Sequence, residues 1–372
     1  MDEPPANWTI LALETSCDET AAAVIRGGRE IVSSVVASQM HLHERYGGVV
    51  PELASREHIT SIAPVINDAL APLARGWDEI DAIACTYGPG LASALLTGVN
   101  AAKGLAWARG KPLVGVNHLE GHIYATWLIP EGTQPDLPPP FPLVALVVSG
   151  GHTALVLLRD HGDYQLLGQT RDDAAGEAFD KAARIMGLGY PGGPQVQQWA
   201  ARATANDLRV PRAWLSDSYD FSFSGVKTHV LQEVERRRAM HVEPAKSLAE
   251  LDPQATASLA AAFQNSIIDV LTQKTVAAAE AYDARCIVLA GGVAANGPLR
   301  ELLIRRAPVP VRYPPITLCT DNAAMIGAAA FYRYVEGLQH DWSLSVVPNL
   351  RLVPHTRPYR RGDERQPPAN RP

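Results

Sequence analysis

Short apolar runs separated by polar or glycine-rich loops recur along the chain. The first run, Trp8 to Leu13, leads into the polar segment ETSCDET, and apolar residues resume from Ala21 to Ile25. This pattern predicts a strand, a polar turn and a second strand. The pattern returns in the second half of the chain, at Leu143 to Val148, SGGHT and Ala154 to Leu158. The two halves therefore begin alike.

Two further sets of segments match between the halves. A strand, a glycine loop and a helix are predicted at Ile80 to Cys85, TYGPG and Leu91 to Trp107, and again at Cys286 to Ala290, GGVAANGP and the run from Leu299. A strand followed by a helix is predicted at Pro112 to Val116 and NHLEGHIYATW, and again at Pro315 to Cys319 and TDNAAMIGAAAFY. Three matched pairs in the same order predict an internal duplication of an α/β lobe.

The sequence between the two halves is rich in proline. Residues 129–142, IPEGTQPDLPPPFP, cannot continue a helix or a central strand. We therefore expect a first lobe at 1–140 ending in this linker, and a second lobe at 141–345 with a helical insertion. A last helix at about 321–336 could pack back on the first lobe, and the basic tail at 354–372 is expected to be disordered.

Composition narrows the class of protein. The 372 residues are 47% hydrophobic and 19% charged, which excludes wholesale disorder. Because the formal charge is −6, a nucleic-acid substrate would need a local basic patch or a basic partner. The four scattered cysteines form no metal knuckle or disulfide framework, and no apolar run reaches about 18 residues. We expect a cytoplasmic protein that is neither secreted nor embedded in a membrane.

The segment HLEGH carries the first candidate chemistry. On a helix, His118 and His122 would project from one face and could bind one metal ion, although such a pair is also common among surface or capping histidines. The duplication favours the metal, because the matching helix start in the other half holds Asp321. Two imidazoles and one carboxylate suit Fe2+, with Zn2+ as the alternative. The spacing differs from the HExxH of zinc proteases, so a protease would lack its general base.

Glycine loops supply the second candidate chemistry. In VVSGGHT, Gly150 and Gly151 either let an anionic ligand approach the backbone or provide the positive φ of an ordinary hairpin. The loop GGVAANGP precedes a helix whose exposed N–H groups favour an anion or a nucleotide. Asp180, on a predicted helix before a PGG turn, could accept hydrogen bonds from a ribose. We interpret its charged neighbours as the solvent-exposed face of that helix.

Together these motifs resemble one known family. The matching segments are ETSCDET, GGVVPELASR, GPGL, NHLEGH, VSGGHT, DDAAGEAFDKAAR, YPGGP, FSFSGVKT, GGVAAN and CTDNAAMIG, in this order from about Ile10 to about Val335. They are similar to the tRNA N6-adenosine threonylcarbamoyltransferases, formerly described as O-sialoglycoprotein endopeptidases. The spellings CTDN and ETSCDET resemble the bacterial or organellar type.

The resemblance implies a fold and a reaction. The fold would be α/β, actin-like or sugar-kinase-like, with two duplicated lobes, a central cleft and a helical insertion in the second lobe. The reaction would transfer a threonylcarbamoyl group from threonylcarbamoyl-AMP to N6 of adenosine 37 in tRNAs that read codons beginning with A. The implied partners are an inactive paralogue and a small ATPase.

The resemblance also implies site residues. Iron would be bound by His118, His122 and Asp321, and the adenylate by Val147, Val148, Ser149, Gly150, Gly151, Asp180, Gly193 and Asn296. Gln197 departs from the acidic residue that many relatives carry. No general base is evident, and Asp18 and Glu19 in ETSCDET are the candidates.

Three other functions remain open at this stage. An actin-like ATPase or small-molecule kinase shares the implied fold, because fold alone does not give function, but it would need carboxylates for Mg2+ rather than a histidine pair. A metalloprotease would be expected to carry an HExxH motif, and the chain has HLEGH instead. A non-catalytic scaffold would have no need of the His-His-Asp set.

Overall fold

The computed structural model describes residues 7–129, 133, 136–204, 208–216, 218–241 and 246–352. These residues divide into two compact units. Unit 1 comprises residues 7–140, Leu158–Tyr164 and 313–352, and unit 2 comprises Phe141–Leu157 and Gln165–Arg312, each within the described ranges. The chain therefore leaves unit 1 and returns to it twice.

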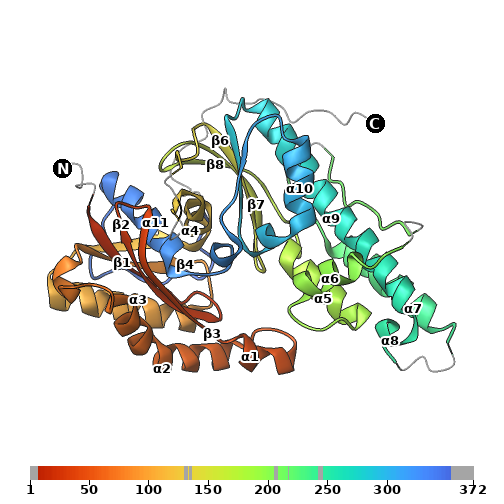
Figure 1. Ribbon diagram of the computed structural model, residues 1–372, viewed down its shortest axis with the longest axis horizontal. Coiled ribbons are helices and arrows are strands. Elements are labelled where there is room, and N and C mark those ends of the chain that lie inside the picture. The colour runs from red at the N-terminus through yellow and green to blue at the C-terminus, as the bar shows by residue number, and fades with distance from the viewer. Residues whose placement is uncertain are drawn as a thin grey trace. The chain divides into compact units, whose positions relative to one another are not determined.

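Unit 1 is built on a five-stranded sheet. Its strands are β1 (Thr9–Glu14), β2 (Glu19–Arg26), β3 (Glu30–Ser38), β4 (Ala82–Gly88) and β5 (Leu113–Asn117). They lie in the order β3-β2-β1-β4-β5, with β1 antiparallel to β2 and parallel to β4 (Figure 1). All six residues of β1 are buried. Because both faces of this strand are covered, it reads as a continuous apolar run rather than an alternating one.

Helices cover both faces of this sheet. They are α1 (Met40–His43), α2 (Pro51–Leu70), α3 (Ala92–Arg109), α4 (His118–Tyr124) and α11 (Ala323–Val335), with 3-10 turns at Glu44–Tyr46, Gly76–Glu79, Ala125–Trp127 and Ile316–Leu318. Leu11 and Leu13 of β1 pack in one cluster with residues of α2 and α3. On the other face, α11 lies so close that a Cβ at Gly327 would stand 2.6 Å from Ile25 and 3.3 Å from Ala12.

The position of α11 alters the expected boundary of the second lobe. Eight residues of this helix are buried, and it contacts β1, β2 and α4. The first eight residues of the helix are apolar or small on every side and must be enclosed, and unit 1 encloses them. The expected second lobe of 141–345 thus differs from unit 2. Unit 2 ends at Arg312 and does not include Leu158–Tyr164, the turn of a strand hairpin, which belongs to unit 1.

Unit 2 repeats the strand order of unit 1. Its strands are β6 (Leu143–Val148), β7 (Thr153–Asp160), β8 (Asp163–Gln169), β9 (Cys286–Ala290) and β10 (Val311–Arg312). They form a five-stranded sheet in the order β10-β9-β6-β7-β8, which is the order of unit 1 when the strands are renumbered from β6. The expected duplication is therefore confirmed within the described residues.

The insertion of unit 2 is helical. Its helices are α5 (Ala175–Met186), α6 (Gly192–Ala200), α7 (Ser224–Arg238), α8 (Leu248–Leu251) and α9 (Pro253–Ala281), followed after β9 by a 3-10 turn at Gly292–Ala295 and by α10 (Gly297–Arg306). The long helix α9 contacts α6, α10 and β6 (Figure 1). No helix in the described ranges is long and apolar enough to span a membrane.

The structure differs from the sequence-based expectation at the strand that was predicted before the last helix. Pro315 to Cys319 was expected as a strand, but β10 lies earlier and Ile316–Leu318 is a 3-10 turn, because Pro314 and Pro315 cannot donate ladder hydrogen bonds. In the linker, Ile129, Thr133 and 136–142 are described, and they form no helix or strand beyond a bridge from Ile129 to Glu30. The expected tail at 354–372 lies outside the described residues.

Candidate metal centre

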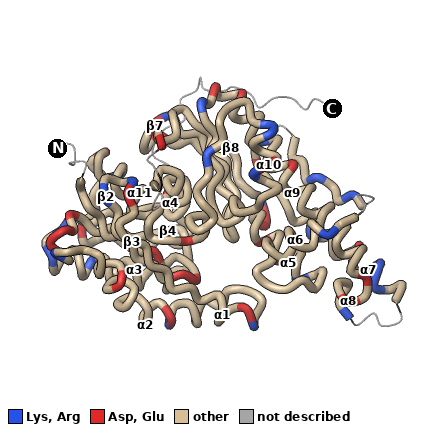
Figure 2. The backbone as a smooth tube through the Cα atoms, in the orientation of Figure 1, with Lys and Arg blue, Asp and Glu red and all other residues tan. Residues whose placement is uncertain are grey.

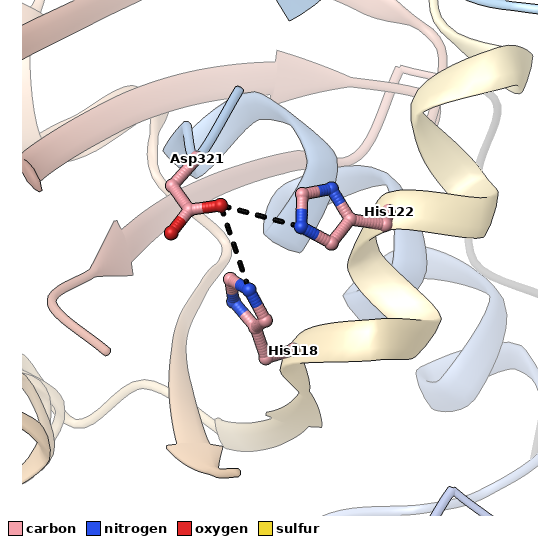
Figure 3. A group of neighbouring side chains, drawn as sticks. All are labelled: His118, His122 and Asp321. Carbon is pink, nitrogen blue, oxygen red and sulfur yellow. Dashed lines mark ion pairs between the residues drawn. The ribbon is translucent and has the colours of Figure 1, made fainter. Parts of the chain in front are cut away.

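The two histidines of HLEGH occupy the start of α4. Asn117, the last residue of β5, caps this helix, its side-chain oxygen accepting a hydrogen bond from the Leu119 N–H at 2.9 Å. His118 and His122 are one turn apart, and their ring centroids lie 4.6 Å from each other. Both rings point toward the same place, as the sequence spacing predicted (Figure 3).

The third side chain of the group arrives from the start of α11. Asn322 caps that helix, and Asp321 directly precedes the cap. The Asp321 Oδ1 atom lies 3.5 Å from His118 Nε2 and 3.2 Å from His122 Nε2 (Figure 3). The three possible ligand atoms all lie within 4.8 Å of one another, and all three residues belong to unit 1. They converge on one point.

The chemistry of these side chains fits a divalent metal ion. Both ring nitrogens of His122 are buried and have no hydrogen-bond partner among the described residues, so the 3.2 Å approach to Asp321 is a close contact without hydrogen-bond geometry. A buried polar group left without a partner is costly, and a metal ion would satisfy it. Two imidazoles and a carboxylate suit Fe2+ or Zn2+.

A carboxylate that the sequence did not single out supports the group. Glu14 is fully buried at the end of β1, and its Oε2 atom lies 3.1 Å from His118 Nδ1. Its carboxylate also accepts hydrogen bonds from the Thr86 hydroxyl and the Ser16 N–H. With its proton on Nδ1 facing Glu14, His118 presents Nε2 to Asp321. A carboxylate behind a ligating imidazole fixes its tautomer and raises its basicity.

The surroundings of the group are anionic. Burial disfavours the imidazolium, but the carboxylates of Asp321 and Glu14 outweigh it and raise the pKa of His118 to about 9. Burial raises the pKa of Glu14, yet the neighbouring His118 more than offsets this, so the pKa is lowered overall. A pocket that holds a proton this tightly favours positive charge, and a metal cation would supply it.

Asp18 lies in the turn that follows β1, and Glu19 is the first residue of β2. Burial, followed by the Asp321 and Asp18 carboxylates, raises the pKa of Glu19 to about 9. Burial and the same carboxylates hold the pKa of the Cys17 thiol well above its usual range. At neutral pH, Glu19 therefore carries a proton and Cys17 is a thiol rather than a nucleophilic thiolate.

The glycine loop after β6 leaves its backbone open. Neither Gly150 nor Gly151 has a positive φ, so the positive φ offered as one explanation of these glycines is wrong, although β6 and β7 are neighbours in the sheet as expected. The loop is instead held by hydrogen bonds between Ser149 and His152, and by the Gly176 N–H, which donates to the Ser149 carbonyl at 3.2 Å. A Cβ at Gly150 or Gly151 would meet nothing within 4 Å. A ligand can therefore reach this stretch of backbone.

Asp180 organises the PGG turn. One of its carboxylate oxygens accepts a hydrogen bond from the Gly192 N–H at 2.7 Å. A Cβ at Gly192 would stand 2.5 Å from the Asp180 Cα, so this close approach of α6 to α5 requires glycine. Next to it, a Cβ at Gly193 would meet nothing within 4 Å. Asp180 thus has a structural contact in addition to the expected ligand contact.

Asn296 and Gln197 hold the second glycine loop. The Asn296 side chain caps α10 and donates to the Gln264 side chain at 3.0 Å. The Gly297 N–H donates to the Gln197 side-chain oxygen at 3.2 Å. An amide oxygen accepts this bond as a carboxylate would, so Gln197 has a structural contact at the position where the family resemblance led us to expect an acidic residue. All these residues belong to unit 2.

Comparison with known proteins identifies the family. A model of the tRNA N6-adenosine threonylcarbamoyltransferase family matches residues 30–328. Proteins of that name from Thermomicrobium roseum and Symbiobacterium thermophilum are 56% and 53% identical, over 93% and 92% of this chain and 98% and 96% of theirs. The chain belongs to this family. It is an acyltransferase that takes part in tRNA modification. Family membership does not favour the alternative of an actin-like ATPase or a small-molecule kinase.

Solved structures agree with the fold. HypF from T.kodakarensis is 12% identical with a TM-score of 0.57, over 90% of this chain and 49% of that one. Full-length HypF in a phosphate- and nucleotide-bound form has a TM-score of 0.54 at 12% identity, over 88% of this chain and 55% of that one. At such identities the likeness shows the fold alone. With the duplicated sheets, it confirms the actin-like, sugar-kinase-like class.

Proposed function

We propose that the chain transfers the threonylcarbamoyl group from threonylcarbamoyl-AMP to N6 of adenosine 37 in tRNAs that read codons beginning with A. The bond between the carbamoyl carbon and the AMP phosphate oxygen breaks, a bond from that carbon to N6 forms, and AMP leaves. N6 gives up one proton. Membership of the family supports transfer of this group to tRNA.

The group of His118, His122 and Asp321 carries the proposal. The two ring nitrogens of His122, which have no hydrogen-bond partner among the described residues, support a resident metal at this place, and we propose Fe2+, with Zn2+ as the alternative. When bound, such an ion supplies Lewis acidity that polarises the carbamoyl group. The exocyclic amine of adenosine is a poor nucleophile, so activation of the electrophile is the main requirement. Glu14 keeps the His118 proton on Nδ1, which leaves Nε2 as a donor to the metal.

We assign the adenylate to unit 2. The backbone from Val147 to Gly151 would bind the AMP phosphate through its N–H groups, stabilising charge that develops as the mixed anhydride opens. Asp180, Gly193 and Asn296 would contact the rest of the nucleotide. The open space above Gly150, Gly151 and Gly193 supports this assignment, because a ligand can approach the chain there without displacing a side chain.

The proton that leaves N6 requires an acceptor. We propose that one of the two carboxylates of the ETSCDET segment, Asp18 or Glu19, accepts it.

Charge supports a role for partner proteins in tRNA binding. Lys and Arg are interspersed with Asp and Glu along the described chain, whose full sequence has a formal charge of −6 (Figure 2). We propose that an inactive paralogue and a small ATPase act with the chain and add the missing basic surface. We also propose a cytoplasmic location, because all four cysteines are free thiols.

Nucleoside analysis of tRNA tests the proposal. The purified chain and its partners are incubated with tRNA, threonine, bicarbonate and ATP, and the tRNA is digested and analysed for N6-threonylcarbamoyladenosine. We expect the modified nucleoside with the wild-type chain. The variant His118→Ala should form much less, and the surface variant Glu30→Gln should match the wild type. Full modification by His118→Ala, or none by the wild type with all partners present, would contradict the proposal.

A further inference from the structure

Glu120 lies between the two histidines in sequence but on the opposite side of their helix. Two residues along an α-helix turn by about 200°, so its side chain leaves α4 away from the His118 and His122 rings. Only 1% of Glu120 is exposed. Its Oε1 accepts a hydrogen bond from the Tyr164 hydroxyl at 2.7 Å, and its Oε2 accepts one from Arg333 Nη1 at 2.5 Å.

These contacts join the two helices that bring the possible metal ligands together. Glu120 belongs to α4, which carries both histidines, and Arg333 belongs to α11, which begins just after Asp321. The Arg333 side chain is 17% exposed, so the ion pair is largely shielded from solvent. Tyr164, from the hairpin end that belongs to unit 1, fixes the other oxygen of the carboxylate.

A second contact between α4 and α11 lies next to the pair. A Cβ at Gly121 would stand 2.6 Å from the Ile326 side chain and 3.2 Å from that of Met325, so the helices touch where α4 has no side chain. Ile326 and Arg333 are seven residues apart, about 10 Å along α11. Two contacts at different heights set the angle between the helices as well as their separation.

We propose that Glu120 and Arg333 are positioning residues that hold α4 at one angle against α11 and so set the separation of Asp321 from the two histidines. The inference rests on the proposed metal site. A helix that pivots about the Gly121 contact would move His118 and His122 relative to Asp321, and a functional constellation tolerates only about 0.5 Å of such displacement.

The nature of the pair favours positioning over simple stabilisation. A buried ion pair contributes little net stability compared with apolar residues of similar volume, because both charges must leave water. Apolar side chains would pack α4 on α11 but would tolerate several angles. A carboxylate held by a guanidinium on one oxygen and a phenol on the other accepts only one arrangement.

Cobalt binding tests the inference without the tRNA reaction. The full-length chain, stripped of metal by a chelator, is titrated with Co2+, and the visible d–d absorption band reports affinity and coordination geometry. The variants are Glu120→Gln, Arg333→Met and the double variant. Because Glu120 and Arg333 touch none of the ligands, we expect for all three about 10-fold weaker Co2+ binding, the lower end of the range for groups bonded directly to a ligand, with an altered band.

Thermal denaturation of the metal-free variants separates positioning from stability. Each single change leaves one buried charge unpaired and should lower the melting temperature, whereas the double variant removes both charges and should recover much of the loss. A double variant that melts like the wild type but binds Co2+ weakly supports positioning. A double variant with wild-type Co2+ affinity and band overturns it. If Glu120→Gln does not fold, Arg333→Lys, which keeps the charge, carries the same test.

A matched control comes from unit 2. Asp269 is a buried carboxylate held by Arg212 and Arg306, so Asp269→Asn should lower the melting temperature without changing Co2+ affinity. Failure of the wild-type chain to bind Co2+ would instead refute the metal site itself. That outcome is distinguishable from unchanged binding by the variants, which refutes only the positioning role.

Discussion

Replacing Glu14 with glutamine should weaken metal binding while leaving the fold intact. The change keeps the size of the side chain and one oxygen that can accept the Ser16 or Thr86 hydrogen bond, but it removes the negative charge behind His118. The imidazole then keeps only a neutral partner, which raises its basicity less than a carboxylate does. Glu14 is fully buried, so water cannot replace the lost carboxylate.

The magnitude follows from the hydrogen bond that changes. A bond to a charged group contributes about 1.5–3 kcal/mol and a neutral bond about 0.5–1.5 kcal/mol. The difference of about 1–2 kcal/mol corresponds to a metal dissociation constant raised about 5- to 30-fold. His118→Ala, which removes the ligand itself, should weaken binding much more than Glu14→Gln.

Competition titration provides the measurement. Wild type, Glu14→Gln and the surface control Glu30→Gln are stripped of metal and titrated with Zn2+ against a chromophoric chelator at constant pH. Circular dichroism of the metal-free proteins checks that each variant is folded. Glu30→Gln should bind like the wild type, because Glu30 is exposed and lies at the start of β3.

An unchanged dissociation constant for a folded Glu14→Gln would refute the reasoning. It would mean that the carboxylate behind His118 contributes nothing to ligation. His118 would then have to orient itself by packing alone.

Three further predictions concern other parts of the chain. His118→Ala should lower kcat more than it raises KM, and Asp180→Ala should raise KM for threonylcarbamoyl-AMP with kcat nearly unchanged, because uniform binding does not speed the chemical step; steady-state transfer at saturating tRNA measures both. The isolated chain should bind tRNA weakly at physiological salt, since its formal charge of −6 supplies few phosphate contacts, and tight filter binding by the lone chain would contradict this. Burial raises the pKa of Asp269, but hydrogen bonds from Arg212 and Arg306 have the larger effect, so the pKa is lowered overall. The ionised carboxylate therefore stabilises the fold above the ordinary pKa of an aspartate, and this stabilisation is lost as pH falls through the lowered pKa. Asp269→Asn should therefore lose less stability than the wild type between about pH 5 and pH 2 in denaturant melts, and an unchanged acid limb would count against the ion pair.

The sequence predicted the elements whose signals are local. Strands β1 and β6 were visible as apolar runs because both faces of each are covered. The pairing of His118 with His122 needed only the pitch of a helix. The match between the two halves pointed to Asp321, but the structure places this residue after a 3-10 turn rather than a strand, and in unit 1 together with the histidines.

The features that the sequence did not predict depend on distant partners. Glu14 appears in the sequence as the last residue before a polar turn, and its partner His118 is 104 residues away. Glu120 appears in the sequence only as a residue between two candidate metal ligands, and its role depends on Arg333, 213 residues further on. Neither pairing has a periodicity that a linear pattern could reveal. The helix expected at about 321–336 does lie against the sheet of unit 1, whereas the end of unit 2 at Arg312 depends on packing that no local pattern reveals.

The way the chain passes twice out of unit 1 and back has a consequence for its synthesis. His118 and His122 emerge from the ribosome about 200 residues before Asp321, which at about 5–20 residues per second is a delay of roughly 10–40 s. Throughout that interval unit 1 also lacks α11, which covers one face of its sheet. The nascent chain must therefore complete nearly all of unit 2 before the three side chains can meet, so loading of the metal belongs to the last stage of biogenesis rather than to an early folding step.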